Sequence, residues 1–157
     1  MTGFLVPLII TLAVQVQASL VIFTPPILAP VAQFDVGVSA AAIGLVTALV
    51  YVAAVPAALF SGLVIERLGA IRVSQLCILV TSSGMAIMAI PNPWVIAIGA
   101  LVIGIGYGAV TPASSTVLAD RVPGGMRSLM FSVKQSGVPI GGAIAGTLVP
   151  FLSLIHI

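Results

Sequence analysis

Residues 94–119 read WVIAIGALVIGIGYGAVTPASSTVLA, and no Asp, Glu, Lys or Arg interrupts them. An α-helix needs about 20 predominantly apolar residues to cross the roughly 30 Å hydrocarbon layer of a bilayer. This stretch exceeds that length, so it is predicted to be a membrane-spanning helix. The rest of the chain follows the same pattern of long apolar runs separated by a few charges.

The composition excludes a soluble globular domain. Of the 157 residues, 61% are hydrophobic and 5% are charged, with a mean hydropathy of +1.34. A soluble domain has roughly 25% charged residues, so lipid is the solvent that fits this surface. The net charge of +2 comes from five basic and three acidic residues, which are too few for a nucleic-acid partner. We therefore predict an all-α, polytopic membrane helix bundle whose partner is the lipid bilayer.

Charges, prolines and glycines divide the chain into apolar runs. The runs predict one transmembrane domain over residues 1–157, with five helices at about 4–32, 40–66, 71–90, 94–120 and 128–154. Prolines in the first run predict a long, bent helix. Residues 34–38 are expected to form a turn, after which Ser39 is a candidate N-cap. Gly69 suits the left-handed position that ends a helix.

The basic residues predict the orientation in the membrane. Arg67 and Arg72 flank the turn between the second and third runs, and Arg121 and Arg127 flank the turn between the fourth and fifth. The two turns on the other side carry no Lys or Arg. Because these residues collect on the cytoplasmic side, we predict a multi-pass protein of the cell inner (plasma) membrane with a cytoplasmic N-terminus.

No catalytic constellation is visible in the sequence, so no enzyme activity is predicted. The sole histidine, His156, is nearly terminal, and no ATP-binding phosphate loop occurs. The single Cys77 excludes an internal disulfide and a cysteine metal cluster. We accordingly expect no cofactor and no metal.

Four segments, in matching order, resemble the Major Facilitator Superfamily of transporters. Residues 62–69, GLVIERLG, are similar to the signature Gly-x-Leu-x-Asp-Arg-x-Gly that follows the second helix of that family. Residues 26–39 look like the end of its first helix. Residues 106–123 and 135–142 are similar to parts of its fourth and fifth helices.

This resemblance implies twelve helices in two bundles, with a small solute bound between them near the middle of the membrane. The chain would then be a fragment of a secondary transporter that works by alternating access. Its partners would be the solute and the C-terminal helices of a full-length transporter. Residues 152–157 also look like translated sequencing adapter, so a non-native tail is one interpretation of them. The alternative is a complete small membrane scaffold or assembly protein without transport activity.

Lys134 is the only charge placed well inside a predicted span. A lysine at the bilayer centre costs at least about 2.5–3.5 kcal/mol, so such residues usually face a partner or an aqueous cavity. One interpretation is a cavity lysine that attracts an organic anion as substrate. The other is a side chain that snorkels to the interface, because Lys134 lies only about 10 Å of helix rise beyond Arg127. Gln135 and Tyr107 are candidate hydrogen-bonding groups for the same ligand.

Thr11, Gln15 and Ser19 recur every four residues in the first run and so share one helix face. Such a polar stripe predicts either a cavity lining or hydrogen bonds between helices. Gln15 is therefore a further candidate for substrate binding, whereas Gln17 is expected to point elsewhere.

The resemblance also implies a gating loop at the cytoplasmic helix ends. Its candidate residues are Gly62, Glu66, Arg67, Gly69 and Arg72. A solvated turn with a modest ion pair is the alternative. Glu66 replaces the Asp of the signature and its usual basic pair is absent, which weakens the expected charge network.

Glycines in the fourth and fifth runs are spaced four residues apart. This spacing predicts close packing between helix backbones. The glycines concerned are Gly104, Gly108, Gly137, Gly141, Gly142 and Gly146.

Overall fold

The computed structural model describes the backbone of residues 3–36 and 39–155, and the side chains of these residues except 29–36, 40 and 153–155. In this part of the chain, five helical spans are long and apolar enough to cross a membrane. The predicted all-α membrane bundle is thereby confirmed. The elements are α1 (Leu5–Val36), α2 (Ala40–Leu68), α3 (Ala70–Met88), α4 (Pro93–Ala119), the 3-10 turn η1 (Gly124–Met126), α5 (Arg127–Gln135) and α6 (Gly137–Ile155).

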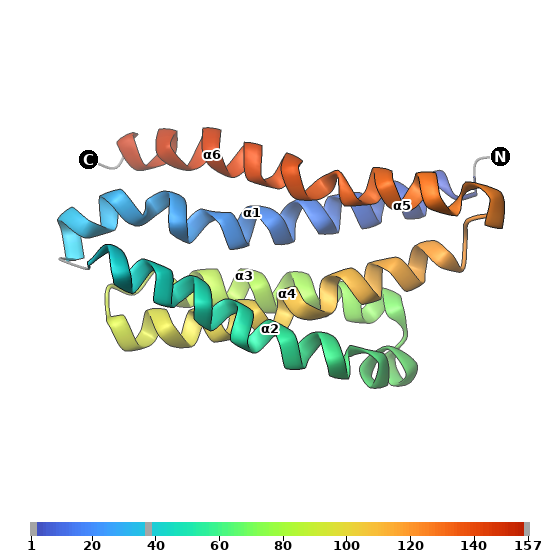
Figure 1. Cartoon of the computed structure of the whole chain (residues 1–157), viewed down its shortest axis with the longest axis horizontal. Helices are drawn as coiled ribbons and strands as arrows, with labels where there is room; N and C mark the ends of the chain where they lie inside the picture. Colours follow the sequence, from blue (N-terminus) through green and yellow to red (C-terminus); the bar gives the residue numbers. More distant parts are fainter. Residues whose placement is uncertain (1–2, 37–38, 156–157) are drawn as a thin grey trace.

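The helices run side by side along one axis, and successive turns alternate between the two ends of the bundle (Figure 1). α4 packs against α2 and α3, and α6 packs along α1. The start of α1, the α2–α3 turn and the α4–α5 turn share one end (Figure 1). We call it the arginine end, because Arg67, Arg72, Arg121 and Arg127 all lie in or beside these two turns.

The turn expected at residues 34–38 is wrong for its first three residues, because α1 continues through Phe34–Val36. Residues 37–38 lie outside the described part. A proline inside a helix removes one backbone donor and bends the helix, but the helix resumes on its far side. Pro25, Pro26 and Pro30 therefore do not end α1.

Specific residues mark the ends of α2 and the start of α4. Gly69 has a φ of +83°, which L side chains rarely adopt, and its N–H donates to the Ile65 carbonyl at 2.8 Å. Ser39 stands at the N-cap position of α2, but its side chain makes no capping bond. Asn92 caps α4, because its Oδ1 accepts a hydrogen bond from the Trp94 N–H at 2.9 Å.

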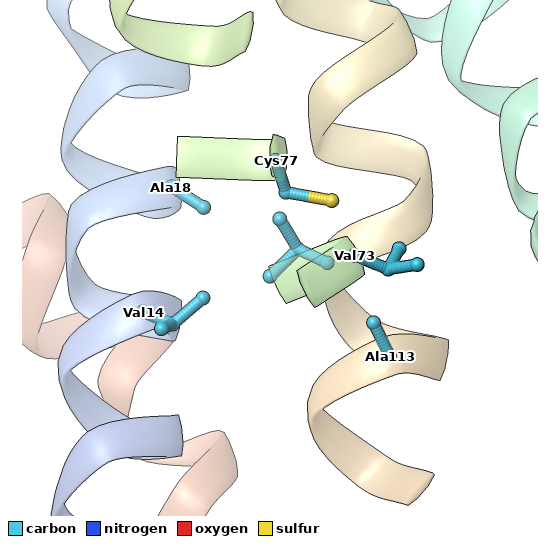
Figure 2. Close-up of a cluster of buried hydrophobic side chains, with 6 residues drawn as sticks. Val14, Ala18, Val73, Cys77 and Ala113 are labelled. Atoms are coloured by element: carbon cyan, nitrogen blue, oxygen red, sulfur yellow. The ribbon is translucent and has the colours of Figure 1, made fainter. Parts of the chain in front are cut away.

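Small and β-branched residues form the core between the helices. Figure 2 shows Val14 and Ala18 of α1 facing Val73 and Cys77 of α3, with Ala113 of α4 beside them. All five side chains are buried. Small side chains at such contacts let helices approach closely, which is typical of membrane bundles.

Large apolar side chains lie on the outside instead. On α2, Leu59 is 76% exposed and Phe60 63% exposed, and Trp94 at the start of α4 is 81% exposed. An apolar exterior of this kind is costly in water and favourable in hydrocarbon. The distribution of side chains therefore agrees with a bundle surrounded by lipid.

Candidate functional site

The fifth span has a proline kink two residues after Lys134. The span is predicted as one helix over residues 128–154, and the structure has one apolar helical span over Gly124–Leu152. Within it, α5 and α6 meet at Ser136, where the Ser136 N–H donates to the Ser132 carbonyl at 3.1 Å and the Ile140 N–H donates to the Ser136 carbonyl at 3.2 Å. Pro139 explains the kink, because it has no N–H to donate to the carbonyl of Gln135, one turn earlier.

Lys134 is enclosed by the bundle. Its side chain is 1% exposed, and its Nζ donates a hydrogen bond to Ser115 Oγ of α4 at 2.9 Å. Within the described residues, this neutral hydroxyl is the only acceptor that the ammonium reaches. The positive charge therefore lies inside a membrane span with a hydrogen bond but without a counter-charge.

Apolar packing closes the site toward the arginine end. Met130, one turn before Lys134 on α5, is buried in a cluster with Leu8 of α1 and with Leu118 and Val122 of α4. These contacts separate the ammonium from the water at that end. The ammonium is thus enclosed by the bundle, and its assignment to a substrate cavity stays a prediction.

The polar stripe of α1 lies against the fifth span. Thr11, Gln15 and Ser19 are all buried, at 2%, 1% and 0% exposure. The Thr11 hydroxyl donates hydrogen bonds to the Pro7 and Leu8 carbonyls of α1. Gln15 Oε1 and Ser19 Oγ, by contrast, have no hydrogen-bond partner among the described residues. Buried polar atoms are rarely left unpaired, so these two oxygens are acceptors available near the kink in the fifth span.

The other two candidate ligand residues are not brought to Lys134. Gln135, its neighbour in sequence, is exposed on the outside of α5. Tyr107 packs edge-on against Tyr51 of α2, with ring centroids 6.4 Å apart and planes at 88°. The structure thus brings together Lys134 and Ser115, beside the α1 stripe, and places Gln135 and Tyr107 elsewhere.

Sequence reasoning missed Ser115 and the role of Gln17. The adjacent serines 114 and 115 in an otherwise apolar span were the available signal for Ser115. Gln17 points away from the stripe, as expected, and its Nε2 donates to Thr81 Oγ1 and Ser82 Oγ of α3 at 3.2 and 3.3 Å. This contact joins α1 to α3.

The residues of the candidate gating loop lie at the arginine end. Glu66, Arg67 and Arg72 are exposed. Within the described part of the chain, none of the three makes a side-chain hydrogen bond or ion pair. Gly62 has open space beside it. The gating function of this loop stays a prediction.

Most of the singled-out glycines lie where helix backbones meet. A Cβ on Gly104 or Gly108 of α4 would overlap the backbone carbonyls of Val50 or Ala54 of α2. On the fifth span, a Cβ at Gly137 would stand 2.9 Å from Gln15 Cβ.

Further along α6, a Cβ on Gly141 would stand 2.7 Å from Ser19 Cβ. Gly142 lies beside Phe23, where a Cβ would be 3.3 Å from the ring. Gly146, by contrast, has no neighbouring atom within 4 Å of a Cβ position.

These features define a class: a multi-pass membrane protein with a kinked fifth span and a buried cation in its interior. The chain matches the family model of the Major Facilitator Superfamily over residues 7–156. It therefore belongs to that superfamily, which confirms the resemblance seen in the sequence.

Curated relatives of the chain include three transporters from different organisms. A gentisate transporter of Corynebacterium glutamicum is 32% identical over 70% of this chain and 25% of its own length. A gallate transporter of Pseudomonas putida is 32% identical over 80% of this chain and 28% of its own. A probable anion transporter of Oryza sativa subsp. japonica is 32% identical over 78% of this chain and 29% of its own length.

The chain thus spans between 25% and 29% of the length of these relatives. No solved structure matches it.

Proposed function

We propose that this chain contributes part of a secondary transporter that moves a small organic anion across the membrane by alternating access. In this proposal Lys134 supplies the positive charge that receives the anion. The role is transport and not catalysis. The arginine end faces the cytoplasm, so that the N-terminus is cytoplasmic and the protein resides in the inner (plasma) membrane.

One observation carries the proposal: the Lys134 ammonium is buried in a span and, among the described residues, is bonded only to the neutral Ser115 hydroxyl. A lysine at the bilayer centre costs at least about 2.5–3.5 kcal/mol, and Lys134, about 10 Å of helix rise beyond Arg127, bears part of that cost. A hydroxyl satisfies one N–H of the ammonium, but it cannot neutralise the charge. A carboxylate ligand would do both, and charge-assisted hydrogen bonds of this kind are about twice as strong as neutral ones.

The position of Lys134 supports the same conclusion. It lies beside the proline kink at Ser136, so a change in this bend would open a path to the ammonium. The unpaired Gln15 Oε1 is available near this kink to accept a hydrogen bond from a hydroxyl group of the ligand. Tyr107 and Gln135 would reach the ligand only after a larger rearrangement, so their roles are secondary here.

The relatives suggest which anions to test first. Two of them are transporters named for gentisate and gallate, which are both aromatic carboxylates with ring hydroxyl groups. Such molecules combine a carboxylate for Lys134 with hydroxyl donors for Gln15. Hydroxybenzoates are therefore the proposed substrate class.

The test is uptake by cells that express the genomic reading frame containing this sequence. Lys134→Ala should lower uptake of labelled gentisate and gallate by about 30-fold or more, because truncating one partner of a buried charge pair costs about 2–5 kcal/mol. Lys134→Arg should keep part of the uptake, and Ser132→Ala, an exposed change on the same helix, should leave it unchanged. Immunoblots of the membrane fraction control for the amount of protein. Unaltered uptake of every anion by Lys134→Ala would refute the proposal.

A further inference from the structure

A pocket of about 410 Å³ lies at the arginine end, away from Lys134. Two turns that are distant in sequence form it. Residues 68–72 contribute from the α2–α3 turn, and Val117, Asp120 and Arg121 contribute from the end of α4. The pocket therefore spans the two turns that carry the arginines.

Two guanidinium groups line this pocket without a protein partner. Arg72 and Arg121 are exposed, and within the described residues neither makes a side-chain hydrogen bond or ion pair. Asp120 lines the same pocket and is also unpaired there. The side chains thus carry two positive charges and one negative charge, a net charge of +1 that one monovalent anion would neutralise.

The planar guanidinium group favours a particular kind of anion. Its N–H donors form a fork that matches two oxygens of a phosphate or carboxylate at once. Two such forks that line one pocket can bind the same phosphate group. A phosphodiester carries the single negative charge that balances this pocket.

Apolar residues in the same pocket indicate where that phosphate comes from. Leu68 and Ile71 are 42% and 57% exposed, and they line the pocket together with Val117. The pocket lies at the end of the spans, where a bilayer changes from acyl chains to headgroups. Basic pockets between transmembrane helices at this depth bind the headgroups of anionic lipids. A soluble phosphate would gain nothing from the apolar wall.

We propose that this pocket binds one anionic phospholipid, with its phosphodiester between Arg72 and Arg121 and its acyl chains along Leu68 and Ile71. Asp120 limits the site to a single negative charge. The inference does not depend on the transport proposal, because the residues that line the pocket include neither Lys134 nor Ser115.

The test measures lipid binding to the purified chain in neutral detergent micelles, by counting lipid adducts in native mass spectrometry. Phosphatidylglycerol should bind at least about tenfold more tightly than phosphatidylcholine, and Arg72→Gln or Arg121→Gln should each remove about tenfold, as expected for loss of a charge-assisted fork. Asp120→Asn should tighten binding. Arg67→Gln is the matched control, because it removes the same charge in the same turn but outside the pocket.

Several results would overturn the inference. An Arg67→Gln effect as large as that of Arg72→Gln would mean that general surface charge, not the pocket, attracts the lipid. Displacement of phosphatidylglycerol by millimolar inorganic phosphate would assign the pocket to a soluble anion. Arg72→Lys and Arg121→Lys keep the charge and should bind the lipid with intermediate affinity. If a glutamine variant loses its helical circular dichroism, these two lysine variants test the inference in its place. Wild-type affinity in both lysine variants would exclude recognition by the guanidinium fork.

Discussion

The Lys134–Ser115 contact predicts a specific coupling in stability. Ser115→Ala removes the hydroxyl that accepts the hydrogen bond from the buried ammonium at 2.9 Å. A hydrogen bond to a charged group contributes about 1.5–3 kcal/mol. Because no other acceptor lies within reach among the described residues, Ser115→Ala should lower the free energy of unfolding by about that amount.

The same change should cost little once the charge is gone. In a Lys134→Met chain, the Ser115 hydroxyl can donate to the backbone of its own helix, as Ser114 does to the Val110 carbonyl at 2.7 Å. The expected cost of Ser115→Ala is then within about 0.5 kcal/mol. Lys134→Met by itself should be neutral or stabilising, because the desolvation cost of about 2.5–3.5 kcal/mol offsets the lost bond.

The assay is equilibrium unfolding of the four chains in mixed micelles with increasing sodium dodecyl sulfate, followed by far-ultraviolet circular dichroism. The double-mutant cycle should give a coupling of about 1–2.5 kcal/mol, well above the roughly 0.5 kcal/mol seen for independent sites. Equal costs of Ser115→Ala in both backgrounds would refute the energetic link between the two residues.

Two further predictions use the same unfolding assay. Gly141→Ala should destabilise the chain by about 1–3 kcal/mol, since the new methyl group would stand 2.7 Å from Ser19 Cβ. Gly146→Ala, at an open position on the same helix, should be neutral or stabilise the chain by up to about 1 kcal/mol, because alanine favours helix. Equal losses in the free energy of unfolding at the two sites would contradict this packing. The Arg127 guanidinium donates hydrogen bonds to the carbonyls of Val122 and Ala119, at 3.2 and 3.1 Å, at and just beyond the end of α4. Arg127→Gln removes both bonds, so it should lower the free energy of unfolding by about 0.3–1 kcal/mol and speed amide hydrogen exchange at that helix end. Unchanged exchange would show that these bonds do not hold the end of that helix.

The sequence was sufficient for the fold class and for the family. Hydropathy identifies a span because the bilayer imposes one length on every crossing. It does not identify the kink at Ser136, since Pro139 removes one helical hydrogen bond without changing the apolar character of the span. In α1, by contrast, the turn expected at residues 34–38 placed the end of the helix near residue 32, whereas the helix continues to Val36.

The sequence could nominate parts of the site but could not assemble them. Lys134 stood out because charges are rare in spans, and the stripe of α1 followed from a period of four. The adjacent serines 114 and 115 were a weak signal for Ser115, because its contact with Lys134 depends on how α4 and α5 pack. Pairing across helices is set by tertiary packing and leaves no local pattern.

The glycine contacts between α2 and α4 also limit how this part of the molecule can move. At Gly104 and Gly108 the backbone of α4 rests directly on carbonyls of α2, so no intervening side chain can change rotamer there to let one helix slide past the other. Such a contact couples the two helices rigidly. We therefore expect α2 and α4 to move together in any conformational change of the bundle.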